Sequence, residues 1–410
     1  MKNDRRKGIV LSYISIALSI LLSLVYTPFL LRKLGQSEYG LYSLVNTVMS
    51  YLTILDYGLG NSIVRFSAKY RQLGNKEKES SLYGMFVILY AIIGAVAFAA
   101  GSLIAFNAET IFANSLEAGQ ESRIFLMIMI AVVNVAISFP LSISSSIIQG
   151  YERYFFTNLL GLVHKILTPL TMISILLAGY GSVGLLLATA VENTFFNLVR
   201  LVYAFKNLRI KIRFKNFEMK IFKEITTFSL FTFITAIADK LFWSIDQVIL
   251  GVMGTMGDIA SYALAAVFIS AFVTVTSVVG HMYLPRFTKM VTRGDSDDDI
   301  NREFIRISRV QFYICMLLFG GFLTVGYRFI TELYATPENA IAYYITVLVM
   351  ASLAFGITQN VALSVLFAKN MHKFRACVKV GVAVLNVALS IVAIIFYPGI
   401  LKDIDRFLCT

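Results

Sequence analysis

The stretch IVLSYISIALSILLSLVYTPFLL, residues 9–31, decides the fold class of this chain. It contains no charged residue and is long enough for an α-helix to cross the hydrocarbon core of a membrane, which is roughly 30 Å thick. A cleaved signal peptide would have a shorter apolar segment followed by small residues at a cleavage site. Here the apolar segment continues into Arg32 and Lys33. We therefore expect a retained first membrane helix.

Further apolar segments of similar length follow, which makes about eleven candidate membrane helices in all. They lie near residues 9–31, 41–64, 81–106, 123–148, 159–178, 184–204, 225–250, 260–284, 310–335, 341–368 and 378–397. All are much longer than a membrane β-strand requires, and the alternating pattern of such strands is absent from the sequence. The composition agrees, since 58% of residues are apolar and 15% are charged, against roughly 45–50% and about 25% in soluble proteins. The sequence predicts an all-α polytopic membrane protein.

Lysine and arginine are distributed unevenly between the two ends of these helices. With the N-terminus in the cytoplasm, 28 of the 36 basic residues fall in cytoplasmic segments and 6 in outer segments, while Lys165 and Lys240 lie within helices. Cytoplasmic loops of membrane proteins are enriched in these residues. We therefore expect a cytoplasmic N-terminus, and the net charge of +12 requires no nucleic-acid partner.

Two charged stretches lie in the predicted cytoplasmic loops. KNLRIKIRFKNFEMKIFKE at 206–224 is the densest basic stretch; topology explains its charge, although it could also attract anionic lipid at about 1 kcal/mol per basic residue. The acidic run DSDDD at 295–299 fails as a calcium loop, because Ile300 and Arg306 stand where an EF-hand needs Gly and Glu. We interpret this run as solvated charge and expect neither a metal site nor a cofactor.

The sequence also contains an internal repeat with an offset near 220 residues. LGQSEYGLYSL at 34–44 and VRFSAKY at 64–70 correspond to MGTMGDIASYAL at 253–264 and PRFTKM at 285–290. The matched residues are Gly35 with Gly254, Tyr42 with Tyr262, and Arg65-Phe66 with Arg286-Phe287. Because the offset spans an even number of helices, both copies have the same membrane orientation. Such repeats are typical of two-lobed secondary transporters with a substrate site between the lobes.

The repeat predicts how the chain is divided. We expect an N-lobe over 1–205 with six membrane helices, a basic linker over 206–224, and a C-lobe over 225–410 with five. The sixth helix of the N-lobe begins near residue 184, so its counterpart would begin near 404, yet the sequence ends at Thr410. We expect either a missing twelfth helix or a truncated reading frame.

The seventh predicted helix holds the strongest candidates for a functional site. Asp239, Trp243 and Asp246 are spaced to share one helical face, and Lys240 and Gln247 share the neighbouring face. Ionisable residues at membrane depth cost roughly 2.5–3.5 kcal/mol each and are candidates for function by default. We expect this polar side to line a cavity; a purely structural ion pair is the alternative.

Four further residues extend this candidate site. Asp56 lies in the second predicted helix and Glu192 in the sixth, and with Asp239 and Asp246 they are candidates for ion coupling. Arg65 and Arg286 are related by the repeat and lie at the cytoplasmic ends of the second and eighth helices. Retention of positive charge in the cytoplasm explains both arginines, and anion capture at the cavity entrance is the alternative.

Motifs for enzyme chemistry are absent from the sequence. There is no GxSxG, HExxH or phosphate-binding loop, and His164, His281 and His372 lie far apart. We therefore expect a protein that is not an enzyme.

Four stretches, taken in order, resemble the O-antigen and polysaccharide flippases of the multidrug/oligosaccharidyl-lipid/polysaccharide exporter superfamily. They are RRKGIVLSYISIALSILLSLVYTPFLLRKLGQSEYGLYSL at 5–44, DYGLGNSIVRFSAKY at 56–70, SSSIIQGYERYFF at 144–156 and SIDQVILGVMGTMGDIASYALA at 244–265. The resemblance implies a bacterial inner-membrane protein that moves undecaprenyl-diphosphate-linked oligosaccharide to the outer leaflet, for synthesis of O-antigen, capsule or exopolysaccharide. The implied partners are this lipid-linked oligosaccharide, membrane lipids, a polysaccharide polymerase and glycosyltransferases.

We expect transport by alternating access, with the polyprenyl tail in lipid and the sugars in a polar cavity. Lys240, Arg65 and Arg286 would offset the diphosphate charge, and an acidic residue would bind H⁺ or Na⁺ to reset the cycle. Three alternatives stay open: a drug/cation antiporter of the same superfamily, a polymerase or ligase for lipid-linked sugars, and an inactive truncated fragment. A polymerase or ligase should carry a long outer loop, and the predicted outer loops are short.

Overall fold

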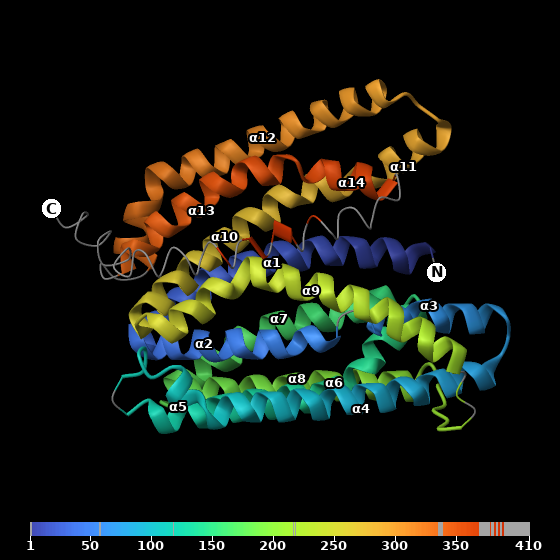
Figure 1. The fold of residues 1–410 in the computed structure, drawn as a ribbon, viewed down its shortest axis with the longest axis horizontal. Helices are drawn as coiled ribbons and strands as arrows, with labels where there is room; N and C mark the ends of the chain where they lie inside the picture. Colours follow the sequence, from blue (N-terminus) through green and yellow to red (C-terminus); the bar gives the residue numbers. More distant parts are fainter. Residues whose placement is uncertain are drawn as a thin grey trace. The chain divides into compact units, whose positions relative to one another are not determined.

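The computed structural model of the protein describes residues 2–368 except 57–58, 118, 216, 218 and 335–338, together with residues 378, 381–382, 384–385 and 388. The regular elements of these residues are helices, with no strand among them (Figure 1). The chain forms two compact units, Met1–Ile259 (unit 1) and Ala260–Thr410 (unit 2). The predicted all-α membrane fold is confirmed.

Unit 1 is built from long helices that pack along one another. Its elements are α1 (Lys2–Leu34), α2 (Gln36–Leu52), η1 (Thr53–Asp56), α3 (Leu59–Gln72), α4 (Lys76–Phe106), α5 (Ala108–Ile111), α6 (Glu121–Gly150), α7 (Tyr154–Leu177), α8 (Gly181–Lys206) and α9 (Met219–Met253). Helix α6 is central, because α2, α3, α4 and α8 all pack against it, while α1 packs against α7. The core includes the fully buried Tyr83, Phe86 and Tyr90 of α4 and Met127 and Ile128 of α6.

The predicted helix at 41–64 is not continuous in the structure. Helix α2 ends at Leu52, a 3₁₀ turn covers Thr53–Asp56, and α3 begins at Leu59. The hydroxyls of Ser50 and Thr53 donate to backbone carbonyls three residues earlier, at 2.6 and 2.8 Å. Such side-chain bonds compete with the regular helical pattern. The sequence pattern showed the apolar length of this segment but not the break.

Unit 2 contains the second group of helices. They are α10 (Met256–Met282, whose first residues belong to unit 1), α11 (Leu284–Arg293), α12 (Asp297–Arg328), the short π-helix η2 (Phe329–Tyr334), α13 (Ile341–Thr358) and α14 (Asn360–Ala368). Helix α12 packs against α13, and α11 packs against α14. The acidic run forms the first turn of α12, where Ser296 Oγ accepts from the Asp299 N–H. Negative charge at a helix N-terminus is stabilising, which gives this run a structural role.

Eight helices within the described residues are long and apolar enough to cross a membrane. They are Ile14–Leu34, Lys76–Phe106, Glu121–Gly150, Tyr154–Leu177, Gly181–Lys206, Met256–Ser277, Asp297–Tyr334 and Ile341–Leu366. Each matches one of the predicted spans. Of the other three, 41–64 is divided, 225–250 lies within α9, and 378–397 falls almost entirely outside the described residues. The count of eleven and the cytoplasmic N-terminus stay predictions.

The order of the helices follows the internal repeat. Helices α1, α2–α3, α4 and α6 recur as α9, α10–α11, α12 and α13–α14. In both copies the second helix ends before a short basic helix, α3 or α11, that carries the repeat-related arginine. The compact units divide at Ile259, whereas the repeat divides the chain at 206–224, because α9 packs against α2, η1 and α3 within unit 1. The lobe boundaries stay a prediction.

Candidate functional site

Helix α9 places three of the predicted cavity residues against α2, within unit 1. The Thr47 hydroxyl donates to Oε1 of Gln247, and Lys240 Nζ lies 5.6 Å from the centroid of the Tyr51 ring. The negative charge of Asp246 acts on the Tyr51 phenol only through space, because the buried Tyr51 hydroxyl has no hydrogen-bond partner among the described residues. A cation over an aromatic face gains about 0.5–2 kcal/mol, more where water is excluded. Lys240 is half-buried, and its amino group lies within cation–π distance of the Tyr51 ring of α2.

The remaining candidates on α9 extend this polar side. Trp243 is 45% exposed, whereas Asp239 and Asp246 are half-buried. The structure therefore brings Lys240, Asp246 and Gln247 together with Thr47 and Tyr51 of α2. The aromatic and hydroxyl contributions from α2 were not predicted. A signal for them was present in the sequence, because Thr47 and Tyr51 are four residues apart on the predicted second helix.

Asp56 lies at the end of the 3₁₀ turn and is held by α4. Tyr90 of α4 donates a hydrogen bond to the Asp56 carboxylate, while Oδ1 of Asp56 is buried without a hydrogen-bond partner among the described residues. A buried acceptor without a donor costs about 1–3 kcal/mol. Oδ1 of this half-buried carboxylate is therefore suited to accept a proton or to bind a small cation.

Glu192 on α8 forms a second buried acidic position, which α7 completes. Its Oε2 accepts from Thr168 Oγ1 at 2.8 Å and lies 4.0 Å from His164 Nε2. The His164 ring stacks on Phe196 at 4.2 Å between centroids. Glu192 Oε1 is buried with no hydrogen-bond partner in the described part of the chain. One oxygen of the Glu192 carboxylate therefore accepts a hydrogen bond, and the other accepts none from the described residues. The sequence did not indicate that Glu192 would lie beside Thr168 and His164.

The two repeat-related arginines have different surroundings. Arg65 on α3 is exposed, with its guanidinium 5.4 Å from the centroid of the neighbouring Phe66 ring. Arg286 on α11 forms an ion pair with Glu303 of α12 at 2.9 Å. The positive charge of Arg286 is thus already balanced within unit 2. The prediction that both residues capture an anion stays untested, and an anion at Arg286 would have to compete with Glu303.

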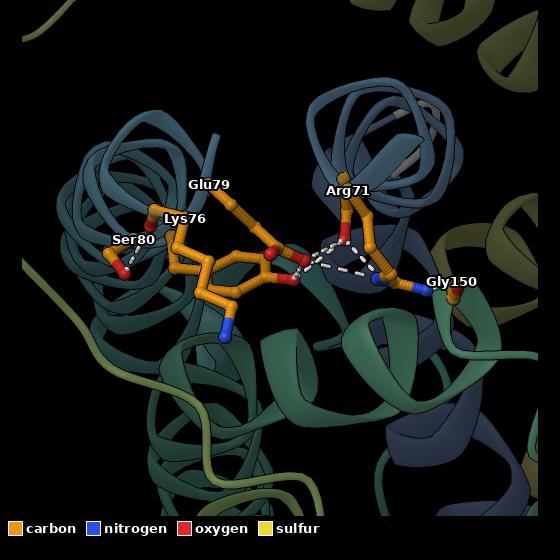
Figure 2. Close-up of polar contacts among 7 residues, drawn as sticks. Arg71, Lys76, Glu79, Ser80 and Gly150 are labelled. Atoms are coloured by element: carbon orange, nitrogen blue, oxygen red, sulfur yellow. Dashed lines mark hydrogen bonds and ion pairs between the residues drawn. The ribbon is translucent and has the colours of Figure 1, made fainter. Parts of the chain in front are cut away.

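A buried polar cluster joins the ends of α3, α4 and α6, and sequence analysis missed it (Figure 2). Glu79 Oε1 accepts from Tyr83 at 2.7 Å, from Ser67 at 3.1 Å and from Arg71 at 3.3 Å. Arg71 also donates to the Gly150 carbonyl oxygen at 2.7 Å. The only signal in the sequence was a glutamate and a tyrosine spaced i, i+4 after a Gly-Asn turn. The cluster fastens three helices at one end of unit 1.

Tyr151, in the turn after α6, closes this cluster from outside. The Arg71 guanidinium carbon lies 3.4 Å from the centroid of the Tyr151 ring, in a cation–π contact. Burial, with the nearby Glu79 carboxylate, raises the pKa of the Tyr151 phenol, and Arg71 partly offsets this rise. The phenol therefore stays protonated at physiological pH and acts as a neutral hydrogen-bonding group.

Comparison with known proteins gives three findings. The family model described as "Polysaccharide biosynthesis protein" matches residues 6–291. The "Uncharacterized membrane protein EpsK" of Bacillus subtilis (strain 168) is 21% identical over 75% of this chain and 62% of its own length. The "Putative O-antigen transporter" of Shigella flexneri is 21% identical over 77% of this chain and 74% of its own length. The matched region thus spans less than two thirds of EpsK.

Solved structures show the same fold. A multidrug resistance MATE family transporter of the MOP superfamily, in an inward-facing conformation, aligns with a TM-score of 0.65 at 14% identity, over 97% of this chain and 99% of that chain. An outward-facing conformation of a MATE family transporter of the same superfamily aligns with a TM-score of 0.52 at 16% identity, over 96% and 95% of the two chains. At these identities the likeness shows the fold alone.

Proposed function

Since this chain belongs to the polysaccharide biosynthesis protein family, we propose that it is a flippase for undecaprenyl-diphosphate-linked oligosaccharide in the bacterial inner membrane. It moves repeat units for O-antigen, capsule or exopolysaccharide from the inner to the outer leaflet. The proposal is for transport without chemical conversion of the substrate. Its partners are the lipid-linked oligosaccharide and membrane lipids, with a polymerase and glycosyltransferases acting before and after the transport step.

The observation that carries this proposal is the half-buried cation Lys240, held over Tyr51 beside Gln247 and Thr47. A positive charge at membrane depth is costly and marks a substrate or ion pathway. A diphosphate carries the opposite charge, and sugars offer hydroxyls for Gln247 and a ring face for the exposed Trp243. The site therefore has a cation for the diphosphate and two side chains for the sugars of a lipid-linked sugar diphosphate.

The transport cycle follows from these separate contacts to the diphosphate and to the sugars. The polyprenyl tail stays in lipid while the diphosphate meets Lys240. Arg65 attracts the diphosphate at the predicted cytoplasmic side, and Arg286, whose charge is balanced by Glu303, contributes less. The two lobes of the repeat then move against each other, so that the site between them opens to one side of the membrane and then to the other, by alternating access. The carboxylates at Asp56, Glu192, Asp239 and Asp246 couple this movement to H⁺ or Na⁺.

A drug/cation antiporter is the second candidate, and the fold shared with MATE family transporters favours it. The two functions differ in the charge of the cargo. A cationic drug would be repelled by Lys240, whereas an anionic diphosphate is attracted. Expression in a drug-sensitive host separates them, because an antiporter raises drug resistance and the proposed flippase leaves it unchanged.

The function itself is tested in a bacterial strain that lacks its own flippase and carries matching glycosyltransferases. Expression of this chain is expected to restore surface polysaccharide, measured by immunoblotting of the exported polymer. The lipid-linked repeat unit should fall at the same time, because it no longer accumulates on the inner leaflet. Full membrane expression with neither change, across hosts that make different repeat units, would overturn the proposal.

The first site prediction concerns Lys240. Lys240→Ala is expected to lower the rate of polysaccharide export at least tenfold, because about 1.4 kcal/mol of lost attraction already corresponds to that factor. Lys240→Arg keeps the charge and should retain most activity. The matched control is Lys289→Ala, which removes an exposed lysine of α11. A Lys240→Ala rate equal to that of the control would exclude Lys240 from substrate binding.

The second site prediction concerns ion coupling at Glu192. Glu192→Gln keeps the shape and the Thr168 contact, but the amide cannot exchange a proton and lacks the negative charge that attracts a cation. We expect export that no longer responds to collapse of the proton or sodium gradient, measured with ionophores in cells. Glu109→Gln, at an exposed position on α5, serves as the control. If the Glu192 variant keeps the ionophore response of the wild type, coupling lies elsewhere.

A further inference from the structure

A cavity of about 540 Å³ lies in unit 1, between the α3–α4 turn and the chain that follows α8. One wall is formed by residues 208–213, which have no regular secondary structure and are fastened to α4. The Arg213 N–H donates to the Ser80 carbonyl oxygen at 3.0 Å, and Ile210 is buried. A Cβ on Gly84 would overlap the Arg213 carbonyl oxygen, so the wall can approach α4 only because this residue is glycine. The cavity therefore has a fixed wall.

The cavity is lined mainly by positive charge. Its basic residues are Arg71, Lys76, Arg209, Lys211 and Arg213. Its two acidic residues are both engaged, since Glu79 pairs with Arg71 at 3.3 Å and Glu77 pairs with Arg213 at 2.6 Å. Lys76, Arg209 and Lys211 are left to supply a net positive charge. Figure 2 shows the Lys76 amino group outside the set of bonds that joins Glu79 to Arg71.

The backbone at Arg209 is the second observation. Its φ of 51° lies in the left-handed region, which non-glycine residues seldom adopt. Such a conformation costs on the order of 1–3 kcal/mol, and strained residues of this kind gather at ligand sites. An exposed arginine whose only role was to keep this loop in the cytoplasm would need no particular backbone conformation. Here the unusual conformation occurs at a cavity-lining arginine.

We infer that this cavity binds the phosphate group of an anionic ligand, at a position separate from the α2–α9 site. Three cations around one cavity suit a phosphate, whose oxygens accept several charge-assisted hydrogen bonds. The cavity lies at the ends of membrane helices on the predicted cytoplasmic side, where basic pockets bind anionic lipid headgroups. A phospholipid headgroup and free inorganic phosphate share this chemistry, and the experiment below separates them.

The test uses the full chain purified in detergent. Binding of cardiolipin, with phosphatidylcholine as the neutral comparison, is followed by native mass spectrometry. Binding of inorganic phosphate is followed by the shift in melting temperature, against chloride at equal ionic strength. The triple variant Lys76→Gln/Arg209→Gln/Lys211→Gln is expected to bind at least tenfold more weakly than the wild type. Loss of cardiolipin binding identifies a lipid headgroup, and loss of the phosphate shift alone identifies a soluble anion; either result supports the site.

The matched control is Lys289→Gln/Arg293→Gln/Arg306→Gln, which removes the same charge from exposed positions of unit 2. Arg209→Gly covers the case of a misfolded triple variant, because glycine relieves the backbone strain while removing one cation. It should fold at least as well as the wild type and bind several-fold more weakly. Equal losses in the cavity and control variants, or a wild type that binds neither probe, would overturn the inference. These readouts do not depend on flipping, so they stand apart from the test of transport.

Discussion

Glu79→Ala is expected to lower the free energy of unfolding by about 3 kcal/mol, because removing one member of a buried ion pair leaves its partners unsatisfied. The Glu79 carboxylate accepts from Ser67, Arg71 and Tyr83, and its side chain is only 8% exposed. The side chain of Arg71 is 32% exposed and keeps its bond to the Gly150 carbonyl oxygen. Part of the penalty is therefore relieved by water, which sets the value at the lower end of the usual range.

The adjacent ion pair supplies the control for this prediction. Glu77 pairs with Arg213 at 2.6 Å, but the two side chains are 79% and 52% exposed. Exposed pairs contribute about 0–1 kcal/mol, so Glu77→Ala should have a small effect. The measurement is the melting temperature of the monodisperse protein in detergent, followed by fluorescence-detected size exclusion. Equal shifts in the two variants would show that the buried cluster does not hold α3, α4 and α6 together.

Gly40→Ala is expected to destabilise the protein by about 3 kcal/mol, because overfilling a tightly packed contact forces the backbone to move. A Cβ on Gly40 would overlap the Met256 carbonyl oxygen. Backbone atoms cannot rotate away as a side chain can. Small residues allow such close approach of helices in membrane proteins. The substitution should therefore separate α2 from the start of α10, within unit 1.

Gly320→Ala provides the matched control on α12. No atom lies within 4 Å of a Cβ added at Gly320, and alanine favours a helix over glycine by up to about 1 kcal/mol. This variant should melt at the same temperature as the wild type or slightly higher. Gly40→Ala should melt several degrees lower or fail to accumulate in the membrane. If the Gly40 variant melts as the control does, the close contact with Met256 is not present in the folded protein.

Much of the fold could be predicted from sequence because its signals are local. A run of apolar residues at 9–31 or 123–148 needs no knowledge of neighbours to indicate a membrane helix. The repeat needs only an offset, and the structure follows it in the order of its helices. The break after Leu52 was missed because hydropathy does not detect the hydroxyl-to-carbonyl bonds found at this position.

The candidate site was predicted only in part, since contacts between distant residues leave no local pattern. The spacing of Asp239, Lys240 and Asp246 indicated a polar side of one helix. It did not reveal that Lys240 lies over Tyr51, or that Gln247 bonds to Thr47 two hundred residues earlier. The Glu79 cluster was missed for the same reason, because its bonds join α3, α4 and α6.

Transport by the purified protein is the most direct test of the proposed function. The chain is reconstituted in vesicles with fluorescent undecaprenyl-diphosphate-linked oligosaccharide, and a membrane-impermeant reductant reports which leaflet holds the sugar. The proposal predicts that nearly all of the labelled lipid becomes accessible to the reductant in vesicles with the wild-type protein. In empty vesicles, only the lipid of the outer leaflet should be accessible. Vesicles with Lys240→Ala should at first show the same accessibility as empty vesicles. Accessibility equal to that of empty vesicles, in vesicles that hold folded wild-type protein and an imposed ion gradient, would contradict it.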